Sequence, residues 1–287
     1  MKIHLECIPC FIKQSLEASR MVTNDKNIHE KVIKEVLKHL QSANFNDSPP
    51  ELSKDVHEII RNITQSDDPY KKIKRQSNEK GREFYQNLKK LVEKADDPLL
   101  KSIQFAILGN VIDFGTFKRF DINEIINNDI NKKFVNQAYP RFKEVLEKSK
   151  TILYLADNTG EIFFDKIFLE ELLKRDKKII YAVKANPIIN DALVEDAEFA
   201  EIDKIAKVIK GDLGQNSSAP GLILKNTSKE FQQIFNSADI VISKGQGNYE
   251  SLNNSSREIF FLLMIKCHLV ADEISIPEGS LVFKVKK

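Results

Sequence analysis

The sequence predicts an α/β protein in which a Rossmann-like, mostly parallel sheet follows an all-helical N-terminal region. Up to residue 148, apolar residues recur at helical spacing, and no segment is a run of β-branched residues. After that point, short apolar runs alternate with helical patterns, which is typical of a parallel sheet covered on both faces. We therefore expect a helical region over residues 1–148 and a Rossmann-like domain over residues 149–287.

The helical region divides at turn and cap signals. Asn24 or Asp25 can cap the second helix, and Pro69 and Pro98 each suit the first turn of a helix. Residues 41–50 have the composition of a loop. The expected helices cover residues 10–21, 28–40, 51–62, 69–94 and 98–111.

Polar turns follow the strands of the second half. The expected strands cover residues 151–156, 178–183, 207–210, 240–243, 260–266 and 280–285. Successive turns offer oxygen ligands, cations and glycines, and open α/β sheets bind ligands outside the carboxyl ends of their strands. The sequence therefore predicts a site on that rim.

Composition excludes several classes of protein. The net charge of +2 arises from 44 basic and 42 acidic residues, a balance that gives no electrostatic footprint for nucleic acid. No stretch reaches the roughly 20 apolar residues of a membrane span, and the N-terminus lacks the pattern of a signal peptide. We expect a cytoplasmic protein whose three cysteines form no disulfide framework.

Asp157, Asn158 and Asp191 are the candidate metal ligands. They follow the first two strands of the second half and offer two carboxylates and one amide oxygen. Such hard oxygen ligands suit Mg²⁺ or Mn²⁺ and are poor ligands for structural zinc. The alternative is a turn in which Asp157 and Asn158 only cap the next helix.

Lys244 lies in a glycine-rich turn that ends with Asn248. Gly245 and Gly247 let backbone amides approach an anion, and the helix that follows adds partial positive charge. This arrangement predicts phosphate binding. The alternative is an ordinary strand-to-helix turn that carries a surface lysine.

Cys7 and Cys10 form a Cys-x-x-Cys motif at the start of a helix. The spacing suits half of a zinc or iron site, or a redox pair. Only Cys267 and His268 remain as further ligands, and they fall in the other predicted domain, so a reduced, partly buried pair is the expectation.

Asn110 and Asp113 lie between Gly109 and Gly115, directly after an apolar helix. This polar segment can reach over the rim of the sheet. The alternative is a helix C-terminus followed by a turn.

Four motifs occur in an order that resembles the damage-control phosphatases, a family long catalogued as a domain of unknown function. The Cys-x-x-Cys motif is similar to that of its prokaryotic members, and the resemblance covers nearly the whole chain. The motifs are residues 109–115, 157–161, 184–191 and 244–248.

The resemblance implies a helical region packed on a Rossmann-like domain that hydrolyses phosphomonoesters of small metabolites, such as sugar phosphates or damaged phosphometabolites. It implies a divalent metal (Mn, Mg, Co or Ni) on Asp157, Asn158 and Asp191. The substrate-contacting positions that it implies are Asn110, Glu161, Asn186, Lys244, Gly245 and Asn248.

The sequence leaves open which group attacks phosphorus and whether the protein is a phosphatase. Either a water activated by the metal, which we favour, or the carboxylate of Asp113 or Asp157 can attack phosphorus. A non-catalytic protein that binds a metal and a phosphometabolite is a rival function. A carboxyl methyltransferase, also proposed for the family, is another, although the turn 157–161 has one glycine where a dinucleotide turn needs about three. The sequence predicts no oligomeric state.

Overall fold

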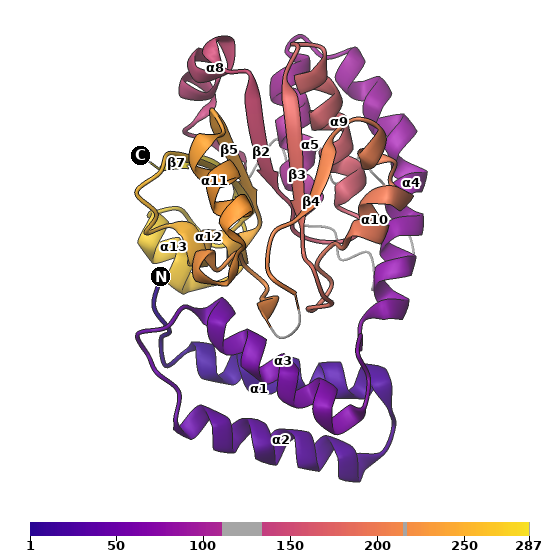
Figure 1. Cartoon of the computed structure of the whole chain (residues 1–287), viewed down its shortest axis with the longest axis vertical. Helices are drawn as coiled ribbons and strands as arrows, with labels where there is room; N and C mark the ends of the chain where they lie inside the picture. The colour runs from indigo at the N-terminus through magenta and orange to yellow at the C-terminus, as the bar shows by residue number, and fades with distance from the viewer. Residues whose placement is uncertain (111–133, 215–216, 287) are drawn as a thin grey trace.

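The computed structural model describes residues 1–110, 134–214 and 217–286, and its centre is a seven-stranded sheet (Figure 1). The strands are β1 (Phe134–Asn136), β2 (Thr151–Leu155), β3 (Lys178–Val183), β4 (Lys207–Lys210), β5 (Ile240–Lys244), β6 (Ile259–Met264) and β7 (Leu281–Lys286). The helices are α1 (Cys7–Val22), α2 (Lys26–Gln41), α3 (Pro49–Thr64), α4 (Lys71–Glu93), α5 (Pro98–Leu108), α8 (Tyr139–Lys148), α9 (Ile162–Leu173), α10 (Val194–Phe199), α11 (Lys229–Ser237), α12 (Gln246–Leu252) and α13 (His268–Ile274).

The sheet has the strand order β1-β7-β6-β5-β2-β3-β4, and the predicted α/β fold is confirmed. Strands β2 to β6 are parallel, whereas β7 runs antiparallel to β6 and β1 pairs parallel with β7. From β2 the chain proceeds outward to β3 and β4, and then returns to build β5 and β6 on the other side. The order therefore reverses between β2 and β5, which is where open α/β sheets form their ligand crevice.

Helices cover both faces of the sheet because its side chains alternate in direction. Ile152 and Tyr154 share one core with α5, α8 and α9, while Leu153 and Leu155 share another with α11, α12 and α13. Helix α9 is apolar almost all round because α4 and α5 pack against its outer side. A central strand buried on both faces gives the near-continuous apolar run seen in the sequence.

The N-terminal helices fall into two groups. Helices α1, α2 and α3 form a bundle with a core of its own, centred on Val32, Val36, Val56 and Ile60. Figure 1 shows this bundle against one end of the sheet, while α4 leads back along the side of the sheet. Helices α4 and α5 belong to the core of the sheet, so one continuous stretch of helices serves two cores.

Three elements were not expected, namely β1, α8 and α13. Strand β1 lies before residue 148, where only helices were predicted, because its three residues are too few to show an alternating pattern. Helix α13 was also missed. In addition, α12 begins at Gln246, earlier than the expected helix near residue 249, so Gly245 becomes the residue before its first turn.

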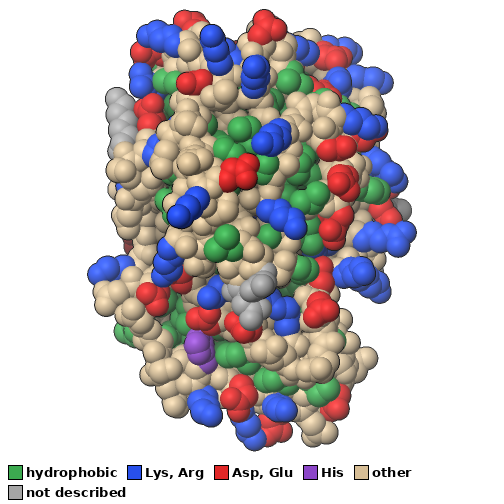
Figure 2. All heavy atoms as spheres, in the orientation of Figure 1, with side chains coloured by type: hydrophobic (Ala, Val, Ile, Leu, Met, Phe, Trp, Pro, Cys, Tyr) green, Lys and Arg blue, Asp and Glu red, His purple; other side chains and the backbone are tan. Residues whose placement is uncertain are grey.

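Among the described residues, no helix combines the length and the apolarity that a membrane crossing requires. Acidic and basic side chains are interspersed over the face shown in Figure 2, as the near-equal totals of 44 and 42 would suggest.

Candidate functional site

The turn after β2 and the loop after β3 lie side by side at the point where the strand order reverses. Asn158 and Asp191 form an antiparallel bridge, and the backbone N–H of Thr159 donates to the carbonyl of Asn190 at 2.9 Å. Asp157 precedes this bridge. The structure thus brings together the three residues predicted as metal ligands.

Asp157 and Asp191 are buried carboxylates. They are 8% and 2% exposed, and burial raises the pKa of Asp157 to about 6 and that of Asp191 to about 8. Asp157 Oδ2 accepts hydrogen bonds from Asn110 Nδ2 at 2.6 Å and Asn158 Nδ2 at 2.7 Å. Lys184 Nζ lies 3.6 Å from Asp191 Oδ2. These partners compensate only part of the buried charge.

These groups suit a divalent cation. Asp191 Oδ2 and Asn110 Oδ1 have no hydrogen-bond partner among the described residues, although both atoms are buried. Two carboxylates that resist ionisation and an amide form the hard oxygen set of a Mg²⁺ or Mn²⁺ site. No group of three His, Cys, Asp or Glu side chains in the described part of the chain is arranged for a metal. Asn158, the third predicted ligand, could supply an amide oxygen beside the two carboxylates.

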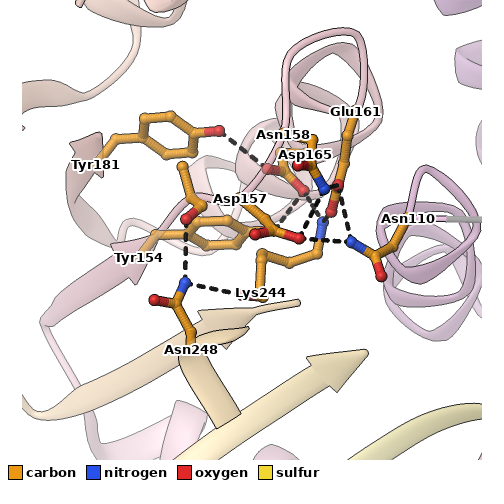
Figure 3. Close-up of polar contacts among 10 residues, drawn as sticks. Asn110, Tyr154, Asp157, Asn158, Glu161, Asp165, Tyr181, Lys244 and Asn248 are labelled. Carbon is orange, nitrogen blue, oxygen red and sulfur yellow. Dashed lines mark hydrogen bonds and ion pairs between the residues drawn. The ribbon is translucent and has the colours of Figure 1, made fainter. Parts of the chain in front are cut away.

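Lys244 ends β5 and is fully buried between two carboxylates (Figure 3). Its ammonium forms ion pairs with Glu161 and, at 2.5 Å, with Asp165. Asp165 also accepts hydrogen bonds from the hydroxyls of Tyr154 at 2.6 Å and Tyr181 at 2.9 Å. The side chain predicted to bind phosphate thus lies between carboxylates in this structure, and its role toward phosphate stays a prediction.

The charge of Lys244 is retained inside the protein. Burial opposes the ammonium form, but Asp165 and Glu161 raise the pKa of Lys244 above its usual value. Glu161 in turn accepts from Asn110 Nδ2 at 3.1 Å, the same amide that reaches Asp157. Lys244 is thus linked to the carboxylates of the site through a shared network.

Asp165 was not among the predicted site residues. It lies one helical turn after Glu161 on α9, so the two carboxylates face the same way. That spacing, together with a lysine at the end of a buried strand, was the sequence signal that could have identified Asp165.

Gly245 brings the backbone against Asp157. Its φ is +81°, and a Cβ atom added here would lie 2.0 Å from Asp157 Oδ2. Both the left-handed backbone and the close approach require glycine. Gly245 thus leaves room for this carboxylate, and its predicted contact with a substrate stays a prediction.

The side-chain amide of Asn248 hydrogen-bonds to three backbone groups. Its Nδ2 donates to the carbonyl of Lys244 at 2.8 Å and to that of Ala156 at 3.1 Å, and its Oδ1 accepts from the N–H of Leu222 at 2.7 Å. The amide therefore ties together the ends of β2 and β5 and the segment at Leu222, and its predicted contact with a substrate stays a prediction.

Asn186 lies on the next loop. Its N–H donates to Ser218 Oγ at 3.0 Å, and Ser218 donates to Asp212 at 2.8 Å. Asn186 is not among the described residues that line the pocket with Asp157. Asp113, and with it the segment up to Gly115, lies outside the described residues.

A pocket of about 430 Å³ opens in front of these carboxylates, between the edge of the sheet and the helical bundle. Asp157, Asn158 and Asp191 line one side of it. The lysine that lines it is Lys266, an exposed residue that follows β6 and whose charge lowers the pKa of the buried Asp157. Lys266 was not predicted, because it lies beyond the turn signals of the sequence.

The cysteines share this pocket. Cys7 and Cys10 line it from α1, and Cys267 lines it from the start of α13, although the sequence places Cys267 far away. All three are free thiols, and burial raises the pKa of Cys7. A metal or redox role for Cys7 and Cys10 stays a prediction.

We predict that Gly245→Ala weakens Mn²⁺ binding at least tenfold more than Gly279→Ala does. Both glycines have a positive φ, +81° and +82°, which strains an alanine at either position. Only at Gly245 does the new Cβ meet a carboxylate, since Gly279 has open space around it. Calorimetric titration of both variants checks this, and equal affinities would contradict the contact.

Asp191→Asn is expected to flatten the pH dependence of stability in metal-free protein. Because burial raises the pKa of Asp191 to about 8 in the folded protein, from an ordinary aspartate value of 3.8, the native state holds the proton more tightly than the unfolded chain. Stability must therefore fall as pH rises from about 4 to about 8. Urea unfolding in the presence of a chelator, at about pH 5 and about pH 8, measures the free energy of unfolding. Between these pH values the wild type should lose more of it than Asp191→Asn does. The control Asp272→Asn, at an exposed position, should lose as much as the wild type.

Lys244→Ala should destabilise the protein by roughly 3–5 kcal/mol, because it leaves the buried carboxylates of Glu161 and Asp165 without their cation. Adding Asp165→Asn should restore part of that loss. The control is Lys148→Ala, which removes a lysine paired with Glu144 at the surface and should change little. Urea unfolding measures all three, and a Lys244→Ala loss no larger than the control's would remove Lys244 from the network.

Comparison with known proteins agrees with this geometry. Residues 3–282 match the model of the damage-control phosphatase ARMT1-like domain. A damage-control phosphatase of Pyrococcus horikoshii is 36% identical, covering 98% of this chain and 97% of that protein, and one of Archaeoglobus fulgidus is 33% identical over 99% of both. The crystal structure of a DUF89 family protein from Pyrococcus horikoshii superposes with a TM-score of 0.89 at 32% identity, covering 100% of both chains. The chain belongs to the damage-control phosphatase ARMT1-like domain family.

Proposed function

We propose that this protein is a phosphatase that hydrolyses phosphomonoesters of small metabolites with a divalent cation held by Asp157, Asn158 and Asp191. The observation that carries the proposal is the pair of buried, incompletely compensated carboxylates that face a pocket at the switch point of the sheet. Relatives that are 33% and 36% identical over nearly the whole chain are named damage-control phosphatases. The geometry and the relatives thus support the same activity.

The ligand set supports Mg²⁺ or Mn²⁺, and Co²⁺ or Ni²⁺ can use the same oxygen atoms. When bound, such a cation would neutralise charge on the phosphoryl oxygens. Asn110 orients Asp157 by its hydrogen bond of 2.6 Å, and Gly245 leaves the room that this carboxylate occupies. Lys184, 3.6 Å from Asp191, balances part of its charge.

Lys266 is the side chain that we assign to the phosphate. It lines the pocket and is exposed, whereas Lys244 is buried in ion pairs. An ammonium at the pocket wall acts as a point charge toward a phosphate oxygen. The cation site and Lys266 would then hold the phosphoryl group from two sides.

We take water as the nucleophile and Asp157 as a metal ligand. Asp157 Oδ2 is held by both Asn110 and Asn158 and is packed against Gly245, which supports a fixed position for this carboxylate, and Asp113 lies outside the described residues. In hydrolysis the water oxygen bonds to phosphorus as the ester P–O bond breaks, and a proton from the water ends on the departing alcohol oxygen. The products are an alcohol and inorganic phosphate.

Asp157→Ala, Asn158→Ala and Asp191→Ala are expected to abolish hydrolysis of an aryl phosphate with Mn²⁺ or Co²⁺. Lys266→Ala should lower kcat/KM about 10- to 150-fold, since one charge-assisted bond is worth roughly 1.5–3 kcal/mol. Lys229→Ala, an exposed lysine of α11, is the matched control.

Steady-state kinetics and metal titration on the same preparations separate the outcomes. Normal metal affinity in Asp191→Ala would refute the ligand assignment. A wild-type protein that binds metal and phosphate without turnover would be a binding protein, and methyl transfer from a labelled donor would identify a methyltransferase.

A further inference from the structure

The helical bundle supplies the wall of the pocket opposite the carboxylates. From α1 come Cys7, Cys10 and Gln14, which are spaced so that they share one face of the helix, and from α3 come Pro50 and Ser53. Figure 1 shows α1 and α3 as the bundle helices nearest to the sheet. A substrate whose phosphate lies at Asp157 would direct the rest of its structure to this wall.

Two polar atoms on this wall have no protein partner. Ser53 is 4% exposed, and neither its Oγ nor the covered Oε1 of Gln14 has a hydrogen-bond partner among the described residues. Ser15, the neighbour of Gln14, instead donates to the carbonyl of Ile12 at 2.8 Å within its own helix. Buried polar atoms without partners are uncommon, because each loses its hydration and gains nothing in return.

We propose that Gln14 and Ser53 recognise the leaving group of the substrate, and that this group carries a hydrogen-bond donor near the phosphate ester. The proposal rests on the phosphatase function proposed above. Gln14 Oε1 can only accept, so it requires an N–H or O–H from the ligand, whereas Ser53 Oγ can accept or donate.

The rest of the pocket has room for that group. Its volume of about 430 Å³ accommodates a metabolite of monosaccharide size, and Phe11, Ile189 and Leu269 add apolar surface to its lining. A site built to pair a donor discriminates strongly against an analogue that lacks it, since its own polar groups then stay unpaired. A hydroxyl of a sugar and an N–H of an amide both supply this chemistry.

The test compares kcat/KM for three kinds of ester: a hexose phosphate, an amide-bearing alkyl phosphate, and an aryl phosphate without a donor. The measured quantity is the ratio of each donor-bearing ester to the aryl phosphate. Ser53→Ala and Gln14→Met should each lower the ratio for the preferred ester about 10-fold. The wild-type ratios decide between hydroxyl and amide.

Ser15→Ala is the matched control, because it removes a buried serine of α1 that already has a partner. Its ratio should equal that of the wild type. Stability gives a second readout. Ser53→Ala removes an unpaired hydroxyl and should leave the ligand-free protein as stable as before or more so, whereas Ser15→Ala should lose stability.

Each result has one meaning. Unchanged ratios in Ser53→Ala and Gln14→Met, with normal wild-type turnover, would overturn this proposal and leave the phosphatase function intact. A loss of stability in Ser53→Ala equal to that of Ser15→Ala would also overturn it. A wild-type protein that hydrolyses none of the esters would overturn the proposed function itself.

Discussion

The ion pairs of Lys244 with Glu161 and Asp165 make the rest of the site possible. An unpaired ionised carboxylate inside a protein costs several kcal/mol, so a cluster of them needs an internal cation. Lys244 compensates the two carboxylates deepest in the fold and leaves Asp157 and Asp191, nearer the pocket, with too little positive charge. That imbalance supports the divalent ion that we propose at this edge of the sheet.

The sheet itself prepares this layer for charge. Tyr154 and Tyr181 are paired in register on β2 and β3, and their stacked rings have centroids 5.3 Å apart. Both hydroxyls donate to Asp165. Their rings complete the apolar core while their hydroxyls satisfy a carboxylate. The same two strands then end at the turn and loop that carry Asp157 and Asp191, so core and site are built by one pair of strands.

Sequence reasoning succeeded where position along a strand determines position in space. Asp157 and Asp191 follow strands of a parallel sheet, so their convergence could be predicted. Lys244 was placed at the correct strand end, but its partner Asp165 comes from the packing of α9 and could not be inferred from the strand pattern. The wall formed by α1 and α3 could not be predicted, since helical periodicity identifies a buried face and not the neighbour that buries it.

The pocket is lined by two parts of the protein that have separate cores, the sheet and the bundle of α1, α2 and α3. The sheet carries the carboxylates and their compensating lysines, which any phosphate ester would use in the same way. The bundle, residues 7–64, lines the other part of the pocket, and under the proposal above it would contact what differs between esters. Under that proposal, substitutions on this small helical module would change selectivity, because its buried core residues differ from those of the sheet and meet the loop before Asp191 at Ile189.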